Sequence, residues 1–389
     1  GLTGIAAGFS ADADVNLFAN NTCSGCNLDG SNGCYNIFLG GCAGKSVTSG
    51  DNNILIGCHA GCKLDEGRDN IAIGKEAGCE LTGSATKCNT IIGAKAGKNV
   101  TTGCYNTLYG SNAGCSISSG SGNVAIGHCA GAAENASTGS QNVTIGCKAG
   151  CDMGVGYKNI VIGALAATKL CCGYNNFFAG EYAARCSNGN LNVAIGRHAG
   201  GFVSASTGSY NVAFGDRALC NLTGGGHNVA LGMAAGACAT SASYNVLMGY
   251  GSGFAFGGYA TGDDNVFIGR HSGSMNWTTG SHNVGIGRCV YQNMGTGSYN
   301  VAFGVYALGR TNLSGNNNIA LGRDAGACVT TGYGNIFLGC GSGYTGSATG
   351  VKTGNKNVAI GYGVTVPDGS ANQQLVIGIG NTTWLRGDS

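Results

Sequence analysis

Residues 192–200 read Asn-Val-Ala-Ile-Gly-Arg-His-Ala-Gly, and this phrase returns along most of the chain. Close copies stand at residues 70–78 and 318–326. The shared pattern is Asn, an aliphatic residue, a small or apolar residue, then Ile, Leu or Phe, then Gly, two variable residues and often Ala-Gly. A short phrase that recurs at a steady interval indicates a solenoid or array of stacked units.

Nineteen Asn-x-x-x-Gly anchors follow one another along the sequence. They begin at Asn36, Asn53, Asn70, Asn89, Asn106, Asn123, Asn142, Asn159, Asn176, Asn192, Asn211, Asn228, Asn245, Asn265, Asn283, Asn300, Asn318, Asn335 and Asn357. Ten of the eighteen steps are 17 residues long, and the others run from 16 to 22. A further anchor begins at Gln374, with Gln in place of Asn. Insertions therefore fall between anchors and not inside them, as in other solenoids.

Each anchor has the pattern of a short β-strand. The first and third residues after the Asn are apolar, which places them on one face of a strand. The Gly that follows permits a turn closed to β-branched residues, and Gly, Ser and Thr precede most anchors as turn formers. The sequence therefore predicts an all-β fold, a parallel β-solenoid (a β-roll or β-helix) of about 20 coils with a repeat of about 17 residues.

Stacked coils would place equivalent residues about 4.8 Å apart, in columns. We predict that the anchor asparagines form a ladder, in which the side chains bond to neighbouring coils and satisfy backbone groups at a corner. The structural ladder is assigned to Asn36, Asn53, Asn70, Asn123, Asn142, Asn192, Asn211, Asn228, Asn300 and Asn318.

The quality of the repeat divides the chain into three segments. Residues 1–33 form an N-terminal cap or degenerate repeats, 34–361 the regular array, and 362–389 a closing segment with the only proline, Pro367. Alanine and glycine leave such a coil with a thin core. One chain is therefore expected to be marginal alone and stable when packed against copies of itself. We expect any signal sequence to lie outside the residues present, because the chain starts without Met.

The charge and hydropathy of the chain limit the classes of partner that it is expected to bind. Charged residues make up only 10% of the chain, the formal net charge is +2, and no basic cluster occurs, so nucleic-acid binding is not expected. No apolar run approaches 18 residues, so membrane insertion is not expected either.

The chain holds 21 cysteines, and several lie five residues after an anchor Gly. Cys62 and Cys79 fall in consecutive coils, at a separation within disulfide range. They form either reduced thiols in a buried column or a disulfide that staples two coils. A zinc site at Cys58, His59 and Cys62 is a third reading, but no second ligand pair follows at zinc-finger spacing. We predict no metal site and no cofactor.

No catalytic constellation stands out, and we predict that the protein is not an enzyme. Ile-Gly-x-x-Ala-Gly fits one unit of the hexapeptide acyltransferase pattern, which needs three units at a strict 18-residue step. Aromatic residues recur at variable positions, where they either add packing or form a sugar- or receptor-binding surface. These residues are Tyr109, Phe177, Phe178, Tyr182, Phe254, Phe256 and Tyr306. The Arg-Gly-Asp at residues 386–388 is expected by chance in so Gly-rich a chain.

The Asn-Val-Ala-Ile-Gly phrase resembles two groups of proteins. One is the left-handed β-roll head of trimeric autotransporter adhesins, whose repeat is shorter than this one. The other is a group of tail-fibre-like structural proteins of marine cyanophages. This second resemblance extends to Thr-Gly-Ser-x-Asn-Val-Ala-Ile-Gly-x-x-Ala-Gly, to the Cys-containing stretches at residues 33–36 and 77–79, and to the closing stretch at 374–389.

The resemblance implies a homotrimeric structural fibre on a phage virion that serves in host attachment. Its partners would be copies of itself, other virion or surface proteins, and a host-surface receptor, for which a glycan is one candidate. It implies a location on the virion surface or outside the cell. The alternative is a bacterial cell-surface adhesin or an extracellular filament subunit.

Overall fold

The computed structural model describes residues 9–11, 16–19, 23–28, 33–133, 136–201, 206–255, 260–275, 278–344, 352–380 and 382–387. The chain divides into two compact units, Gly1–Leu191 and Asn192–Ser389. Every regular element among the described residues is a β-strand, and no helix occurs there.

The first unit contains strands β1 to β11, each three residues long. They are β1 (Phe9–Ala11), β2 (Leu17–Ala19), β3 (Ile37–Leu39), β4 (Ile54–Ile56), β5 (Ile71–Ile73), β6 (Thr90–Ile92), β7 (Thr107–Tyr109), β8 (Val124–Ile126), β9 (Val143–Ile145), β10 (Ile160–Ile162) and β11 (Phe177–Ala179).

The second unit contains β12 to β23. They are β12 (Val193–Ile195), β13 (Val212–Phe214), β14 (Val229–Leu231), β15 (Val246–Met248), β16 (Val266–Ile268), β17 (Val284–Ile286), β18 (Val301–Phe303), β19 (Ile319–Leu321), β20 (Ile336–Leu338), β21 (Val358–Ile360), β22 (Leu375–Ile379) and β23 (Thr382–Gly387).

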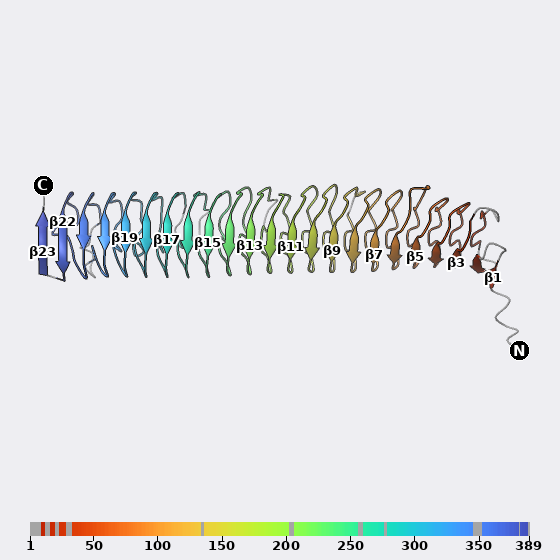
Figure 1. Cartoon of the computed structure of the whole chain (residues 1–389), viewed down its shortest axis with the longest axis horizontal. Coiled ribbons are helices and arrows are strands. Elements are labelled where there is room, and N and C mark those ends of the chain that lie inside the picture. Colours follow the sequence, from red (N-terminus) through yellow and green to blue (C-terminus); the bar gives the residue numbers. More distant parts are fainter. Residues whose placement is uncertain are drawn as a thin grey trace, which may run out of the picture. The chain divides into compact units, whose positions relative to one another are not determined.

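Within each unit the strands lie side by side in chain order, one from each coil (Figure 1). Neighbouring strands pair in parallel with anchors in register: Val212 of β13 lies opposite Val229 of β14, and Val229 opposite Val246 of β15. The same register holds from β2 through β11 in the first unit. The predicted parallel β-solenoid with a repeat of about 17 residues is confirmed.

The two faces of each strand differ in burial in an informative way. The middle residue of every described anchor strand points inward, whereas the first and third are half-buried or exposed, as in β10 and β19. The apolar residues at the first and third positions do share one face, as predicted, but that face is the outer one. We call it the outer strand face.

The interior is a narrow column of small side chains with occasional large ones. Ala194, Ala213 and Ala230 fill the strand position in three successive coils, and each is at most 1% exposed. Where the strand residue is large, a neighbour is small: Phe267 lies beside Gly285 in the register, and the ring of Tyr291 occupies the space that a Cβ on Gly285 would need. The core is thin, as the Ala and Gly content of the repeat predicts.

The corners of the coil depend on left-handed backbone conformations. The residue before each anchor Asn has a φ near +60°, for example +61° at Tyr210 and +59° at His227. The anchor glycine has a φ of about +130°, as at Gly215 (+133°), a conformation that side chains rarely adopt. These corners explain why one residue at each anchor is Gly.

Both ends of the described array extend the pattern. Asn16 is buried, its Oδ1 accepts the backbone N–H of Asn36 at 2.7 Å, and β2 pairs in parallel with β3. A coil in ladder register therefore already lies within the segment expected to be a cap or degenerate repeats. At the other end, β22 continues the parallel stack and β23 folds back antiparallel onto it, so a hairpin closes the sheet edge.

Candidate functional site

The anchor asparagines form a continuous hydrogen-bonded ladder within each unit. In the second unit, the Oδ1 atom of Asn192 accepts the backbone N–H of Asn211 at 2.9 Å and its Nδ2 at 3.3 Å. The Oδ1 of Asn211 serves Asn228 in the same way, at 3.0 Å for both bonds. Asn211 Nδ2 also donates to the carbonyl of Gly225 at 3.0 Å. Each amide thus satisfies buried backbone groups of its neighbours.

The same pattern runs through the first unit. Asn53 donates to Asn36 Oδ1 from its backbone N at 2.9 Å and from Nδ2 at 3.1 Å, and Nδ2 reaches the Gly67 carbonyl at 2.8 Å. All ten ladder residues assigned from the sequence are buried: Asn36, Asn53, Asn70, Asn123, Asn142, Asn192, Asn211, Asn228, Asn300 and Asn318. The ladder is a structural element, because solvent and ligands have no access to it.

Cys62 and Cys79 lie where consecutive coils bring them together. Their Sγ atoms are 3.0 Å apart, and both are free thiols. Burial raises the pKa of Cys79 to about 12, with a further contribution from the hydrogen bond to Cys62. Cys79 is therefore protonated at neutral pH and poorly nucleophilic. Both cysteines are reduced thiols in this structure, and their sulfur atoms are close enough for an oxidant to convert them to a disulfide.

No metal centre is found among the described residues. There, no group of three or more His, Cys, Asp and Glu side chains is arranged to hold an ion. Cys58 Sγ and His59 Nδ1 are 3.1 Å apart, but the pair has no third ligand in the described part of the chain. The six histidines are exposed or half-exposed.

An aromatic column follows the residues that precede the anchors of the second unit. The rings of Tyr210 and His227 stack at 4.7 Å, and those of His227 and Tyr244 at 4.8 Å. The two tyrosines are 52% and 58% exposed. Because each ring covers the face of the next, the column presents ring edges to solvent. It suits edge contacts better than the stacking of a flat ligand.

A surface groove of about 440 Å³ crosses four coils of the second unit, β13 to β16. It lies at the second residue after the anchor glycine, where the column reads Arg217, Ala234, Gly251 and His271. The backbone N–H of His271 donates to the Tyr250 carbonyl at 2.9 Å, which fixes the register of that corner. Two small residues between two large ones leave a depression with a large side chain at each end. We call it the corner groove.

The sides of the corner groove are mostly apolar. Met233 and Tyr250 line it from the first position after the anchor glycine, and Phe254 from the fifth. Asp216 and Asn221 add polar atoms. The volume falls within the range of small-molecule pockets. Phe254 stands out in the sequence, but the groove does not; the signal that could have indicated it is the Ala and Gly between two large residues in one column.

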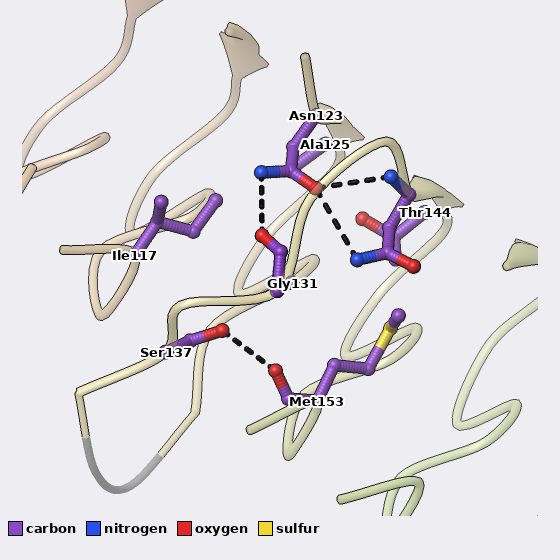
Figure 2. Close-up of a pocket in the computed structure, with 9 residues that line it drawn as sticks. Ile117, Asn123, Ala125, Gly131, Ser137, Thr144 and Met153 are labelled. Atoms are coloured by element: carbon purple, nitrogen blue, oxygen red, sulfur yellow. Dashed lines mark hydrogen bonds between the residues drawn. The ribbon is translucent and has the colours of Figure 1, made fainter. Parts of the chain in front are cut away.

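The first unit holds a much smaller internal cavity, shown in Figure 2. Its volume is about 20 Å³, and Ala125, Thr144 and Met153 contribute to its lining. Ser137 Oγ donates to the Met153 carbonyl at 2.6 Å beside it (Figure 2). A space of this size holds about one water and excludes any larger ligand. It marks a packing defect where a polar Thr stands in the core column.

The aromatic residues singled out from the sequence are scattered. Tyr109 is 58% exposed on the outer strand face, and Phe178 is fully buried in the core. Tyr306 stacks with the Arg310 guanidinium at 4.6 Å. Phe256 lies outside the described residues, as does the Asp of the Arg-Gly-Asp stretch. Of this set only Phe254 belongs to the corner groove.

Comparison with known proteins adds no assignment. Within the described residues, no helix is long and apolar enough to cross a membrane. No protein-family model matches this chain, and no curated protein matches its sequence.

Proposed function

We propose that this chain is a structural fibre protein, a homotrimeric β-solenoid displayed on a phage virion and used in host attachment. The observation that carries the proposal is the outer strand face. In β12 to β22 the first and third residues are apolar without exception. In β3 to β11 only Thr90 and Thr107 interrupt the pattern.

Parallel sheets normally have both faces covered, and their strands are apolar throughout for that reason. Here the inner face is covered by the coil itself, whereas Phe214 is 54% exposed and Ile160 42% exposed on the outer face. A contiguous apolar face of this kind marks an interaction surface. Another copy of the chain matches it best, because a copy carries aliphatic residues at the same spacing.

The virion location and the trimer rest on the resemblance of the repeat and of residues 374–389 to cyanophage fibre proteins. A repetitive, uncharged core held by amide ladders suits a protein that must remain extended outside a cell. The surface left free by self-association, including the corner groove, would then face the host.

Self-association is tested with two lysines on the outer strand face. Ile319 and Leu321 are 38% and 39% exposed there, so replacing both with Lys should not disturb the core. We expect the purified wild-type chain to be trimeric by light scattering and the Ile319→Lys/Leu321→Lys variant to be monomeric. Thr331→Lys, at an exposed position away from the strand, is the matched control and should stay trimeric. A monomeric wild-type chain would remove the proposal of a trimer.

The virion role is tested on purified particles. Peptides of the chain should be found by mass spectrometry in phage particles banded in a density gradient, and antibodies against the chain should label the tail and block adsorption. If the peptides are absent from particles and instead found on intact bacterial cells, the alternative holds. That alternative, an adhesin or filament subunit, is favoured by the likeness of the repeat to the autotransporter β-roll.

A further inference from the structure

The corner groove combines a small-molecule volume with an excess of positive charge. Asp216 lines the groove, but its Oδ1 is 3.2 Å from Arg197 Nε, which offsets its charge. Within the described residues, Arg217 has no carboxylate at ion-pair distance. Among the described lining residues, Asp216 is the carboxylate, and it is paired with Arg197, whereas Arg217 lines the groove without such a partner and Arg270 lies over the Tyr250 ring. An anionic ligand is favoured by this charge distribution.

Tyr250 gives the groove a flat apolar surface that also lies beside a cation. The Arg270 guanidinium is 5.9 Å from the centre of the Tyr250 ring, and the His271 ring meets that ring edge-on at 5.0 Å. Unlike the rings of the aromatic column, Tyr250 has no stacked aromatic neighbour among the described residues, and the Arg270 guanidinium lies over its ring instead. Together with Met233 it can pack against the apolar C–H face of a sugar ring.

Polar side chains around this surface suit hydroxyl groups. Asn221 offers an amide, and Asp216 offers a carboxylate that accepts hydrogen bonds. Burial, and secondarily the nearby Arg270, lower the pKa of His271, so its imidazole is neutral at neutral pH and can exchange hydrogen bonds with a hydroxyl. The His271 ring leans over Gly251, where a Cβ would lie 2.8 Å from its Nδ1.

We propose that the corner groove binds a carboxylated sugar unit of a surface polysaccharide. Arg217 pairs with the carboxylate in the two-pronged geometry that guanidinium groups favour. Tyr250 and Met233 pack against the ring, and Asp216, Asn221 and His271 bind hydroxyls. The inference rests on the proposed role in host attachment and names the chemical class of the receptor.

The test measures binding of oligosaccharides to the purified full chain by calorimetry. The probes are a glucuronic acid oligomer, a glucose oligomer of equal length and an oligo-glutamate peptide. We expect the acidic oligosaccharide to bind at least about tenfold more tightly than either other probe, a difference of about 1.4 kcal/mol. Equal binding of the two saccharides, preferential binding of the peptide, or no saccharide binding would overturn the inference.

Single substitutions test whether the corner groove is the binding site. Arg217→Gln and Tyr250→Ala should each weaken binding of the acidic oligosaccharide about tenfold, and Arg217→Gln should also abolish the preference over the neutral one. Arg323→Gln, an exposed arginine outside the groove, is the control and should bind as the wild type does. Unchanged binding in Arg217→Gln would overturn the assignment, provided that circular dichroism shows a folded protein.

The pH dependence of oligosaccharide binding provides an independent test. Protonation of His271 adds positive charge beside the carboxylate, so binding should tighten as the pH falls from 7 to 5, and His271→Gln should lose this dependence. A pH dependence that is unchanged in His271→Gln would contradict the place given to His271. Detection of the chain in virions without saccharide binding would remove this inference alone, whereas binding by a chain absent from virions would remove the virion role alone.

Discussion

At the scale of single residues, the anchor position needs an amide of one particular length. Asn192 accepts two bonds through Oδ1 while Asn211 donates through Nδ2, and a carboxylate lacks the donor that this pattern uses. The longer Gln374 stands only at the last anchor. There its backbone N–H donates to Asn357 Oδ1 at 2.9 Å, and its Nε2 reaches the Asp368 carbonyl at 2.6 Å.

We predict that Asn211→Leu destabilises the protein by about 3 kcal/mol or more. The change removes the Nδ2 group that donates to Asn192 Oδ1 and to the Gly225 carbonyl, although the backbone N–H still reaches Asn192 Oδ1. It also leaves the backbone N–H and Nδ2 of Asn228 without their acceptor. Each unsatisfied buried group costs about 1–3 kcal/mol. Thermal and urea unfolding followed by circular dichroism measure the loss. Asn312→Leu, at an exposed position, is the control, and an equal melting temperature in both variants would contradict the ladder's role.

A second residue carries a defect that can be removed. Tyr291 is fully buried, and its hydroxyl has no hydrogen-bond partner among the described residues. Burial raises its pKa well above the ordinary value, so the group stays neutral. Tyr291→Phe should therefore stabilise the protein by about 1 kcal/mol, because it deletes an unsatisfied polar atom without opening a cavity. A lower unfolding midpoint in urea would show that the hydroxyl has a partner in solution.

Thiol reactivity should follow burial. Cys79 has a pKa raised to about 12 by burial and by its bond to Cys62, whereas Cys147 is exposed. Because the thiolate is the reactive form, iodoacetamide at pH 8 should modify Cys147 well before Cys79. Peptide mass spectrometry at timed intervals measures both rates. Similar rates for the two cysteines would mean that the coils open locally faster than the reagent reacts.

At the scale of the element, the repeat predicts each strand and its register but not which face is inward. Val193 and Ile195 alternate with Ala194. A two-residue period is satisfied equally whether Val193 and Ile195 or Ala194 point inward. Aliphatic residues on the outside are explained only if another surface covers them, and no pattern within one chain shows that surface. The corner groove was missed for a related reason, because it depends on residues that are spread over four successive coils.

The internal cavity offers a test of packing in one element. Thr144 of β9 is the polar member of a core column in which Leu108 and Val161 occupy equivalent positions. Thr144→Ile replaces the hydroxyl and adds a methyl group beside a space of about 20 Å³. We expect a gain of about 1 kcal/mol in the free energy of unfolding. A loss would show that the hydrogen bond from Thr144 Oγ1 to the Val124 carbonyl, at 3.3 Å, contributes more than the added apolar contact.

At the scale of the whole molecule, the fold was predictable because one local rule is applied about twenty times, so errors in any single repeat do not accumulate. The step of 17 residues and the anchor Asn are enough to specify parallel coils. The division into two units at Leu191 and Asn192 was not predictable, because the anchor pattern continues through it without a change of composition. The oligomeric state stays a prediction.

The stability of the protein should fall at acidic pH and at alkaline pH and should change little between them. The ladder amides do not titrate. His271 has a lowered pKa, so the unfolded chain binds its proton first and stability should fall as the pH drops below about 6.5. Cys79 and Cys220 have pKa values raised to about 12 and about 11, so the unfolded thiols ionise first and stability should fall above pH 9.

Melting temperature measured from pH 3 to 10 checks this profile. His271→Gln should flatten the acidic limb and leave the alkaline limb in place. A profile that tracks the carboxylates instead, with its main loss near pH 4, would show that surface ion pairs such as Lys98–Glu76, whose carboxyl pKa is lowered by the hydrogen bond from Lys98, matter more than their exposure implies.

The one-directional ladder also has a genetic consequence. Within each unit, the Oδ1 atom of one ladder asparagine accepts two hydrogen bonds from the next, so junctions that share this pattern are interchangeable. Duplication or loss of a whole 17-residue segment by recombination would leave all remaining junctions unchanged. Copy number could therefore vary between strains as a means of setting reach, while the chemistry of each junction stays the same.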